Sequence, residues 1–244
     1  MVFGPLVDGD YMVSGYRLRI ARSSGELAYS RFNDRGEVVA SARLSESLNL
    51  SFIPVEPAGG PGLGLIECIY LKLSEPIVID SNGRLDVKIT APVDYGVVAH
   101  SKGGSYSLVD SFPESSIPYK LALYGPPTQG VICRFHKVDL GKPQGPGLAS
   151  LNVRVVNETE GVARVNTIII PLGGVKVFYK PGTWVAVMSN ASMVLESSNV
   201  ASIHFDPEPV SADFDESPDI VKGDTHPMEY VVRGKGEFKM IWGY

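Results

Sequence analysis

The chain has 244 residues, of which 44% are hydrophobic and 20% charged, the usual composition of a folded globular protein. Its formal net charge of −5 argues against nucleic acid as a main partner, because nucleic-acid-binding surfaces are basic. The first residues lack the basic and apolar segments of a secretion signal, and no apolar run approaches the roughly 20 residues of a membrane-spanning helix. We therefore expect a cytoplasmic protein without membrane insertion.

The first half of the chain carries a series of strand patterns. Residues 16–20 alternate apolar and arginine side chains, which predicts a half-buried strand with a basic outer face. Residues 26–32 and 37–44 predict a hairpin, because Asn, Asp and Gly between them favour a tight turn. The prolines of residues 52–57 predict an edge strand or irregular chain. Residues 84–89 alternate charged and apolar side chains and give the clearest amphipathic strand pattern.

A glycine- and proline-rich segment at residues 141–147 predicts a linker. It would separate an N-terminal β module, residues 1–140, from a C-terminal β-sandwich module, residues 148–244. Short strands every 8–12 residues give the second module the rhythm of an immunoglobulin-like sandwich, without the Cys…Trp…Cys spacing. The predicted fold is all-β, with two contacting antiparallel β-sandwich modules; one elongated β-sandwich is the alternative. One short helical turn is indicated, at residues 217–223.

The central stretch, residues 121–136, carries the densest set of reactive side chains. Its glycines at positions 125 and 130 have the separation of a phosphate-binding loop, but the lysine and hydroxyl residue of that loop are missing. Cys133 and His136 point to opposite faces of a strand, so they are not expected to form a catalytic pair. Arg134 and His136 share a face, which could bind a carboxylate or phosphate or pair with an acidic neighbour.

A second group of candidates suggests metal chemistry. His204 and Asp206 lie on one side of a predicted strand, and with His136, His226 or Glu208 nearby they could hold zinc or another divalent ion. The four histidines of the chain are scattered, with no pair at ligand spacing, so we predict no cofactor. The corresponding enzyme alternative is a metal-dependent hydrolase or lyase that uses a His/Asp cluster of His136, His204, Asp206 and His226.

No nucleophile-elbow or zinc-protease motif occurs, so we favour a non-enzymatic binding or scaffolding protein of unknown function. A carbohydrate-binding β-sandwich is a further alternative, because aromatic side chains can stack on sugars. The candidate stacking residues are Tyr70, Tyr106, Tyr119, Tyr124 and Trp184.

Charge is distributed unevenly along the chain. Residues 16–43 hold six arginines against three acidic residues, whereas residues 181–232 hold nine acidic residues and one lysine. Opposed patches could pair within one chain or across an interface, and an exposed edge strand needs covering. We therefore expect a homo-oligomer or a protein partner.

Several segments together resemble an archaeal family of unknown function, the domain of unknown function 432. They are residues 52–57, 92–96, 123–125 with 130–135, and 241–244. The family brings no established activity, substrate or cofactor, and it implies an archaeal, cytoplasmic setting. The two cysteines, Cys68 and Cys133, suit buried free thiols in a reducing interior, but hyperthermophile proteins also form intracellular disulfides. The resemblance makes a Cys68–Cys133 disulfide more plausible.

Overall fold

The computed structural model describes residues 1–57, 66–125, 130–141, 143–197, 200–206, 208, 211–218 and 238–241. Strands β1 to β20 account for the regular structure of these residues, which include no helix. The all-β prediction is therefore confirmed. No helix that could cross a membrane occurs in the described part of the chain. The predicted helical turn at residues 217–223 lies mostly outside it.

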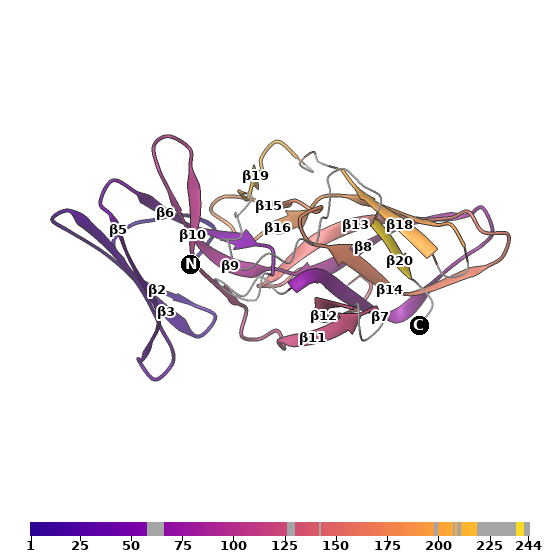
Figure 1. Ribbon diagram of the computed structural model, residues 1–244, viewed down its shortest axis with the longest axis horizontal. Helices are drawn as coiled ribbons and strands as arrows, with labels where there is room; N and C mark the ends of the chain where they lie inside the picture. The colour runs from indigo at the N-terminus through magenta and orange to yellow at the C-terminus, as the bar shows by residue number, and fades with distance from the viewer. Residues whose placement is uncertain are drawn as a thin grey trace.

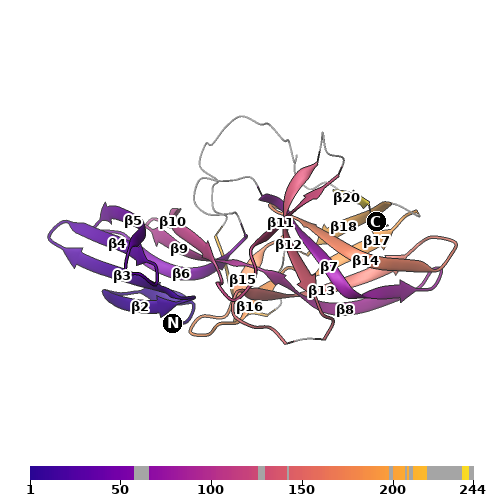
Figure 2. The ribbon, with the colours of Figure 1, turned by 90° about the horizontal axis from the view of Figure 1, so that it is seen from below.

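One end of the elongated molecule is a four-stranded antiparallel meander, which we call sheet B (Figures 1 and 2). Its strands in spatial order are β2 (Gly9–Val13), β3 (Tyr16–Ser23), β4 (Glu26–Phe32) and β5 (Val38–Ser45). The strand predicted at residues 16–20 and the predicted hairpin are β3 and the β4–β5 pair. Leu18, Leu27 and Tyr29 point inward and are buried, whereas Arg17 and Arg19 lie on the outer face, as the alternation of residues 16–20 predicts.

Sheet A lies beside sheet B and follows the order β1-β6-β9-β10. Its strands are β1 (Gly4–Leu6), β6 (Asn49–Val55), β9 (Asp94–His100) and β10 (Tyr106–Pro113). β6 has a neighbour on each side only at residues 50–52; residues 53–55 pair with β9 alone among the described strands, in agreement with the predicted edge position. Pro54 is tolerated there because β1 pairs only with residues 50–52, so no strand lies opposite the missing N–H on that side.

A four-stranded sheet, sheet C, and an eight-stranded sheet, sheet D, form the other end of the molecule (Figure 2). Sheet C contains β11 (Lys120–Tyr124), β12 (Val131–Val138), β7 (Ile66–Ile79) and β14 (Ala163–Pro171), in that order. Sheet D contains β19 (Asp215–Glu216), β15 (Val177–Tyr179), β16 (Ala186–Met188), β13 (Leu148–Asn157), β17 (Ala191–Leu195), β18 (Val200–Phe205) and β20 (Phe238–Ile241), and β8 (Arg84–Pro92) also pairs with β13. Most pairs are antiparallel, but β12–β7, β13–β16 and β13–β17 are parallel.

The boundary predicted at residues 141–147 needs correction. β8 pairs with β13 from Arg84↔Val156 to Pro92↔Leu148, and β7 pairs with β14. Strands from both sides of the segment therefore share sheet C and sheet D, and a cut there would divide both sheets. The Gly/Pro composition marks a turn between strands, since the Gly147 carbonyl accepts a hydrogen bond from the Val93 amide at 3.0 Å.

One hydrophobic cluster runs through all four sheets. It includes Leu18 of sheet B, Phe52 of sheet A, Ile69 of sheet C and Leu151 of sheet D. An aromatic group joins sheet A to the β15–β16 side of sheet D, with Trp184 lying 5.5–5.9 Å, centroid to centroid, from its aromatic neighbours. This continuity favours one elongated body over two separate cores.

Glu114 fixes the connection between sheets A and C. Its carboxylate accepts hydrogen bonds from the Tyr95 hydroxyl at 2.8 Å and from the Ser116 amide at 3.1 Å. Burial alone would raise the pKa of Glu114, but these hydrogen bonds outweigh it and hold the pKa below its usual value. Gly147 packs directly on this side chain with a left-handed φ of 70°, so the turn after the predicted linker needs glycine.

Candidate functional site

Arg134 is the most deeply buried of the charged residues predicted to form a site. It lies on β12 with 1% of its surface exposed, and its guanidinium carbon is 3.6 Å from the centroid of the Tyr119 ring. Within the described residues, its Nε and Nη1 atoms have no hydrogen-bond partner. Burial lowers the pKa of Arg134, while the charge of Asp94 and the phenol of Tyr119 act in the opposite direction.

Asp94 and His136 complete this polar cluster. Asp94 is 1% exposed at the start of β9, and its charge acts on both Arg134 and Tyr119. Burial lowers the pKa of His136, the Arg134 charge lowers it further, and Asp139 partly offsets both. Burial and the Arg134 charge therefore both favour the neutral imidazole. The charge of the buried Asp94 carboxylate thus opposes, without outweighing, the effect of burial on the guanidinium, on the face predicted to bind an anion. Asp94 belongs to sheet A and Arg134 to sheet C.

The metal candidates occupy a different sheet. His204 is exposed on β18 opposite Ser192 of β17, and exposed Asp206 accepts a hydrogen bond from the Glu208 amide at 3.1 Å. His226 lies outside the described residues. Among the residues that the structure places, no three His, Cys, Asp or Glu side chains gather in a metal-binding group. His136 belongs to sheet C and His204 to sheet D.

Cys68 and Cys133 are joined by a disulfide that spans 65 positions of sequence. Their strands, β7 and β12, run parallel with the two cysteines directly opposite each other, and both side chains are buried. The chain has only these two cysteines, so it offers no free thiol as a nucleophile. The bond ties together strands that only a long connection relates in sequence.

The aromatic residues proposed for sugar stacking have separate partners. Trp184 packs within the aromatic group of sheet A, and Tyr70 stacks on Phe135 at 5.8 Å between ring centroids. Tyr106 lies against His100, whereas Tyr119 covers Arg134. Tyr124 packs against the hydrophobic core. Each ring therefore has a contact within the fold, although Tyr106 and Tyr119 remain 53% and 44% exposed.

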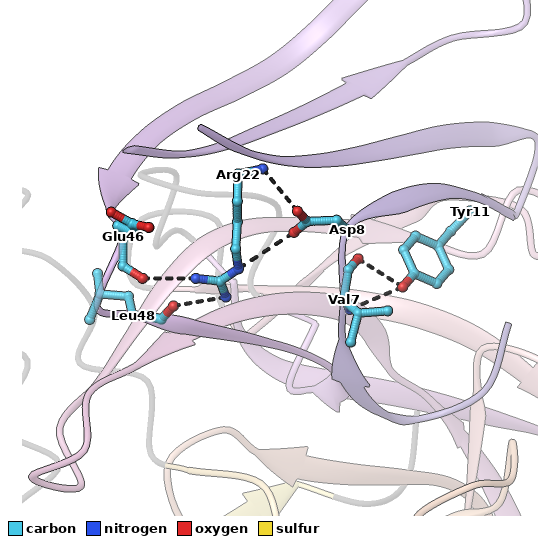
Figure 3. A network of polar contacts seen from close by, with 6 residues as sticks. All are labelled: Val7, Asp8, Tyr11, Arg22, Glu46 and Leu48. Carbon is cyan, nitrogen blue, oxygen red and sulfur yellow. Dashed lines mark hydrogen bonds and ion pairs between the residues drawn. The ribbon is translucent and has the colours of Figure 1, made fainter. Parts of the chain in front are cut away.

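A surface pocket of about 500 Å³ lies where sheets A and B meet. It is lined by Pro5, Leu6, Val7, Asp8, Arg22, Asn49, Leu50 and His100. Figure 3 shows that the charged side chains beside it are already engaged. Arg22 donates to the carbonyl oxygens of Glu46 at 2.8 Å and Leu48 at 3.1 Å, and its Nε lies 3.4 Å from Asp8 Oδ1. Arg22 therefore holds the β1–β2 connection against the β5–β6 turn.

A second network anchors sheet B from its inner face. Asp110 of β10 is fully buried and accepts hydrogen bonds from the Tyr29 hydroxyl at 2.6 Å and from Arg31 Nε at 2.7 Å and Nη2 at 3.1 Å. The Arg31 guanidinium also lies between the rings of Tyr16 and Phe112, 4.7 and 4.6 Å from their centroids. Burial alone would lower the pKa of Arg31, but Asp110 outweighs it and raises the pKa. Sheet B is thereby fixed rigidly to sheet A.

The outer edge of sheet B is the least protected feature among the described strands. β5 is an eight-residue edge strand, none of whose residues is buried, and it pairs only with β4. Val38 and Val39 are 56% and 46% exposed, and Arg43 is the single charged residue of the strand. Sequence reasoning located this strand but missed its role as an edge. Residues 40–45 alternate apolar and polar side chains like any half-buried strand, so the local pattern gives no signal of the edge.

Comparison with known proteins identifies the family alone. No curated protein and no solved structure matches this chain. The model of a family described as "Protein of unknown function (DUF432)" matches residues 4–235, so the resemblance inferred from the central motif and its flanking segments is confirmed. The chain belongs to the DUF432 family of proteins of unknown function.

Proposed function

We propose that the protein is a non-enzymatic interaction scaffold that binds an extended strand along β5. One observation carries the proposal: β5 is a long edge strand with no buried residue and no neighbour on its outer side among the described strands. Such an edge presents a row of backbone N–H and C=O groups, which a further strand can satisfy.

The composition of β5 supports strand binding. Soluble proteins protect an exposed edge with prolines, lysines or inward-pointing charges. β5 has neither proline nor lysine, and its one cation, Arg43, lies 3.5 Å from Glu26 of the neighbouring β4. Its centre, Ala40-Ser41-Ala42, has small side chains that allow another backbone to approach closely.

The anchoring of sheet B also supports this function. The Arg22 and Asp110 networks hold both the turn that follows β5 and the inner face of the sheet. A strand held in place before binding loses little conformational entropy when a partner adds to it, so more of the pairing energy appears as affinity. We place this activity in the archaeal cytoplasm that the family resemblance implies.

The test uses a generic strand probe. The probe is a fluorescent ten-residue peptide of alternating threonine and valine with a lysine at each end, and binding is measured by anisotropy. We expect Val39→Lys to weaken binding at least tenfold, because a charge at the edge opposes strand addition. Val162→Lys makes the same change at a valine that is 67% exposed outside sheet B, and should leave binding unchanged. A probe that does not bind, or that binds both variants equally, refutes the proposal.

A further inference from the structure

We infer that the strand bound by β5 is β5 of a second copy of this chain, so that two copies of sheet B form one continuous eight-stranded antiparallel sheet. The inference rests on the proposed function, since it names the partner of the same edge. The two-fold axis would pass through Ala42, where each β5 meets the other.

The register follows from the regular part of β5. A bulge interrupts the pairing with β4 between Arg31↔Ala40 and Phe32↔Val38, whereas residues 40–45 pair without a break. In a symmetric antiparallel pair, the two partners are equidistant from the axis and share a face of the sheet. An axis at Ala42 keeps the central pairs within the regular stretch and opposes Ala40 to Leu44, Ser41 to Arg43, and Ala42 to itself.

Side-chain chemistry fits this register. On the inner face, Leu44 meets the small Ala40, so the partly buried leucine finds an apolar neighbour. On the outer face, Arg43 meets the hydroxyl of Ser41, and no charged residue faces its own copy. Like charges directly opposite would destabilise the pair.

The basic character of sheet B does not oppose this association. Four of its arginines form ion pairs: Arg19 with Asp10, Arg22 with Asp8, Arg31 with Asp110 and Arg43 with Glu26. Most of the positive charge that the sequence concentrates in residues 16–43 is thus neutralised locally. Over longer distances the remainder is screened, with a Debye length of about 8 Å at physiological salt.

Pairing through one short strand predicts a dissociable dimer. A stable interface buries roughly 1,600 Å² in total, and a pair of strands covers much less. Association is therefore measured by sedimentation velocity over a concentration series, which follows the monomer–dimer equilibrium. A partner of another kind on β5 would leave the protein monomeric throughout the series.

Opposite charges at one exposed position test the register. Ser41→Arg places a cation against Arg43 of the second copy, twice in each dimer, and Ser41→Glu places an anion there. At low salt we expect Ser41→Glu to dimerise at least tenfold more tightly than Ser41→Arg, and the difference to shrink as salt screens the charges. Equal dimerisation constants for the two variants would overturn the register.

Cysteine cross-linking gives a readout that does not depend on charge. The native cysteines are joined in a buried disulfide, so a new thiol is the only one free. Mild oxidation should convert Ala42→Cys to a covalent dimer, because residue 42 faces its own copy, and leave Ser41→Cys monomeric. The reverse pattern would refute the Ala42 axis. If the protein stays monomeric in both sedimentation and cross-linking but still binds the strand probe, self-pairing is refuted and the proposed function stands. If it also fails to bind the probe, the proposed function is refuted as well.

Discussion

Removing the Asp110 carboxylate is the sharpest perturbation of the contact between sheets A and B. Asp110 accepts three hydrogen bonds from Tyr29 and Arg31, and the Arg31 side chain is only 12% exposed. Asp110→Ala leaves this buried cation without its counter-ion and the tyrosine hydroxyl without its acceptor. Breaking a buried ion pair at one partner costs about 3–5 kcal/mol, so we expect a loss of that size in the free energy of unfolding.

Guanidinium-induced unfolding measures this loss, with Asp86→Ala as the matched control. Asp86 also pairs with an arginine, Arg154 at 2.8 Å, but both side chains are more than half exposed. An exposed pair contributes about 0–1 kcal/mol, so the control should unfold almost like the parent protein. Hydrogen exchange should also quicken in β4 and β5 of Asp110→Ala. Equal losses in the two variants would refute the view that Asp110 anchors sheet B.

Three further predictions concern other parts of the fold. Replacing both Cys68 and Cys133 by alanine should lower the free energy of unfolding by about 4 kcal/mol, since the bond closes a loop of 65 residues, and calorimetry would show a lower Tm. Because the pKa of Glu114 is depressed in the folded protein, its ionised carboxylate stabilises the fold above the pKa of an unfolded glutamate, and this stabilisation is lost as the pH falls below about 4.3. The denaturant midpoint of unfolding, measured over a pH series, should therefore decline less steeply at acid pH for Glu114→Gln. Gly147→Ala should destabilise the protein well beyond Gly141→Ala in chemical denaturation, because both glycines have left-handed φ but only a Cβ at Gly147 would clash with Glu114.

In this chain, local sequence pattern predicts where strands occur but not which strands pair. The alternation of residues 84–89 and the turn residues between β4 and β5 each locate their strands, because side-chain period and turn chemistry are local properties. The pairing of β8 with β13 joins residues 84–92 to residues 148–157, and no local signal encodes it. Gly and Pro at residues 141–147 predict a break in regular structure correctly, but they do not distinguish a turn between sheets from a domain linker.

The same difference between local pattern and contacts from distant parts of the chain applies to the candidate site residues. The shared face of Arg134 and His136 follows from strand period, but the opposing charge of Asp94 comes from another sheet and is invisible to sequence pattern. From sequence alone, Cys68 and Cys133 fit buried free thiols, with a disulfide as the exception. Parallel pairing of β7 with β12 brings the two sulfur atoms together, and this is a property of topology.

The reactive side chains of the central stretch are therefore engaged within the fold. Cys133 is held in the disulfide, Arg134 is buried under Tyr119, and burial together with the Arg134 charge favours the neutral form of His136. Residues 38–45, which carry one charge and no reactive group, instead present a backbone edge that the described part of the fold leaves uncovered. In a β protein that acts by strand addition, recognition resides in backbone hydrogen bonds. The interacting segment then needs small side chains and a fixed position, which β5 has, and needs no distinctive chemistry.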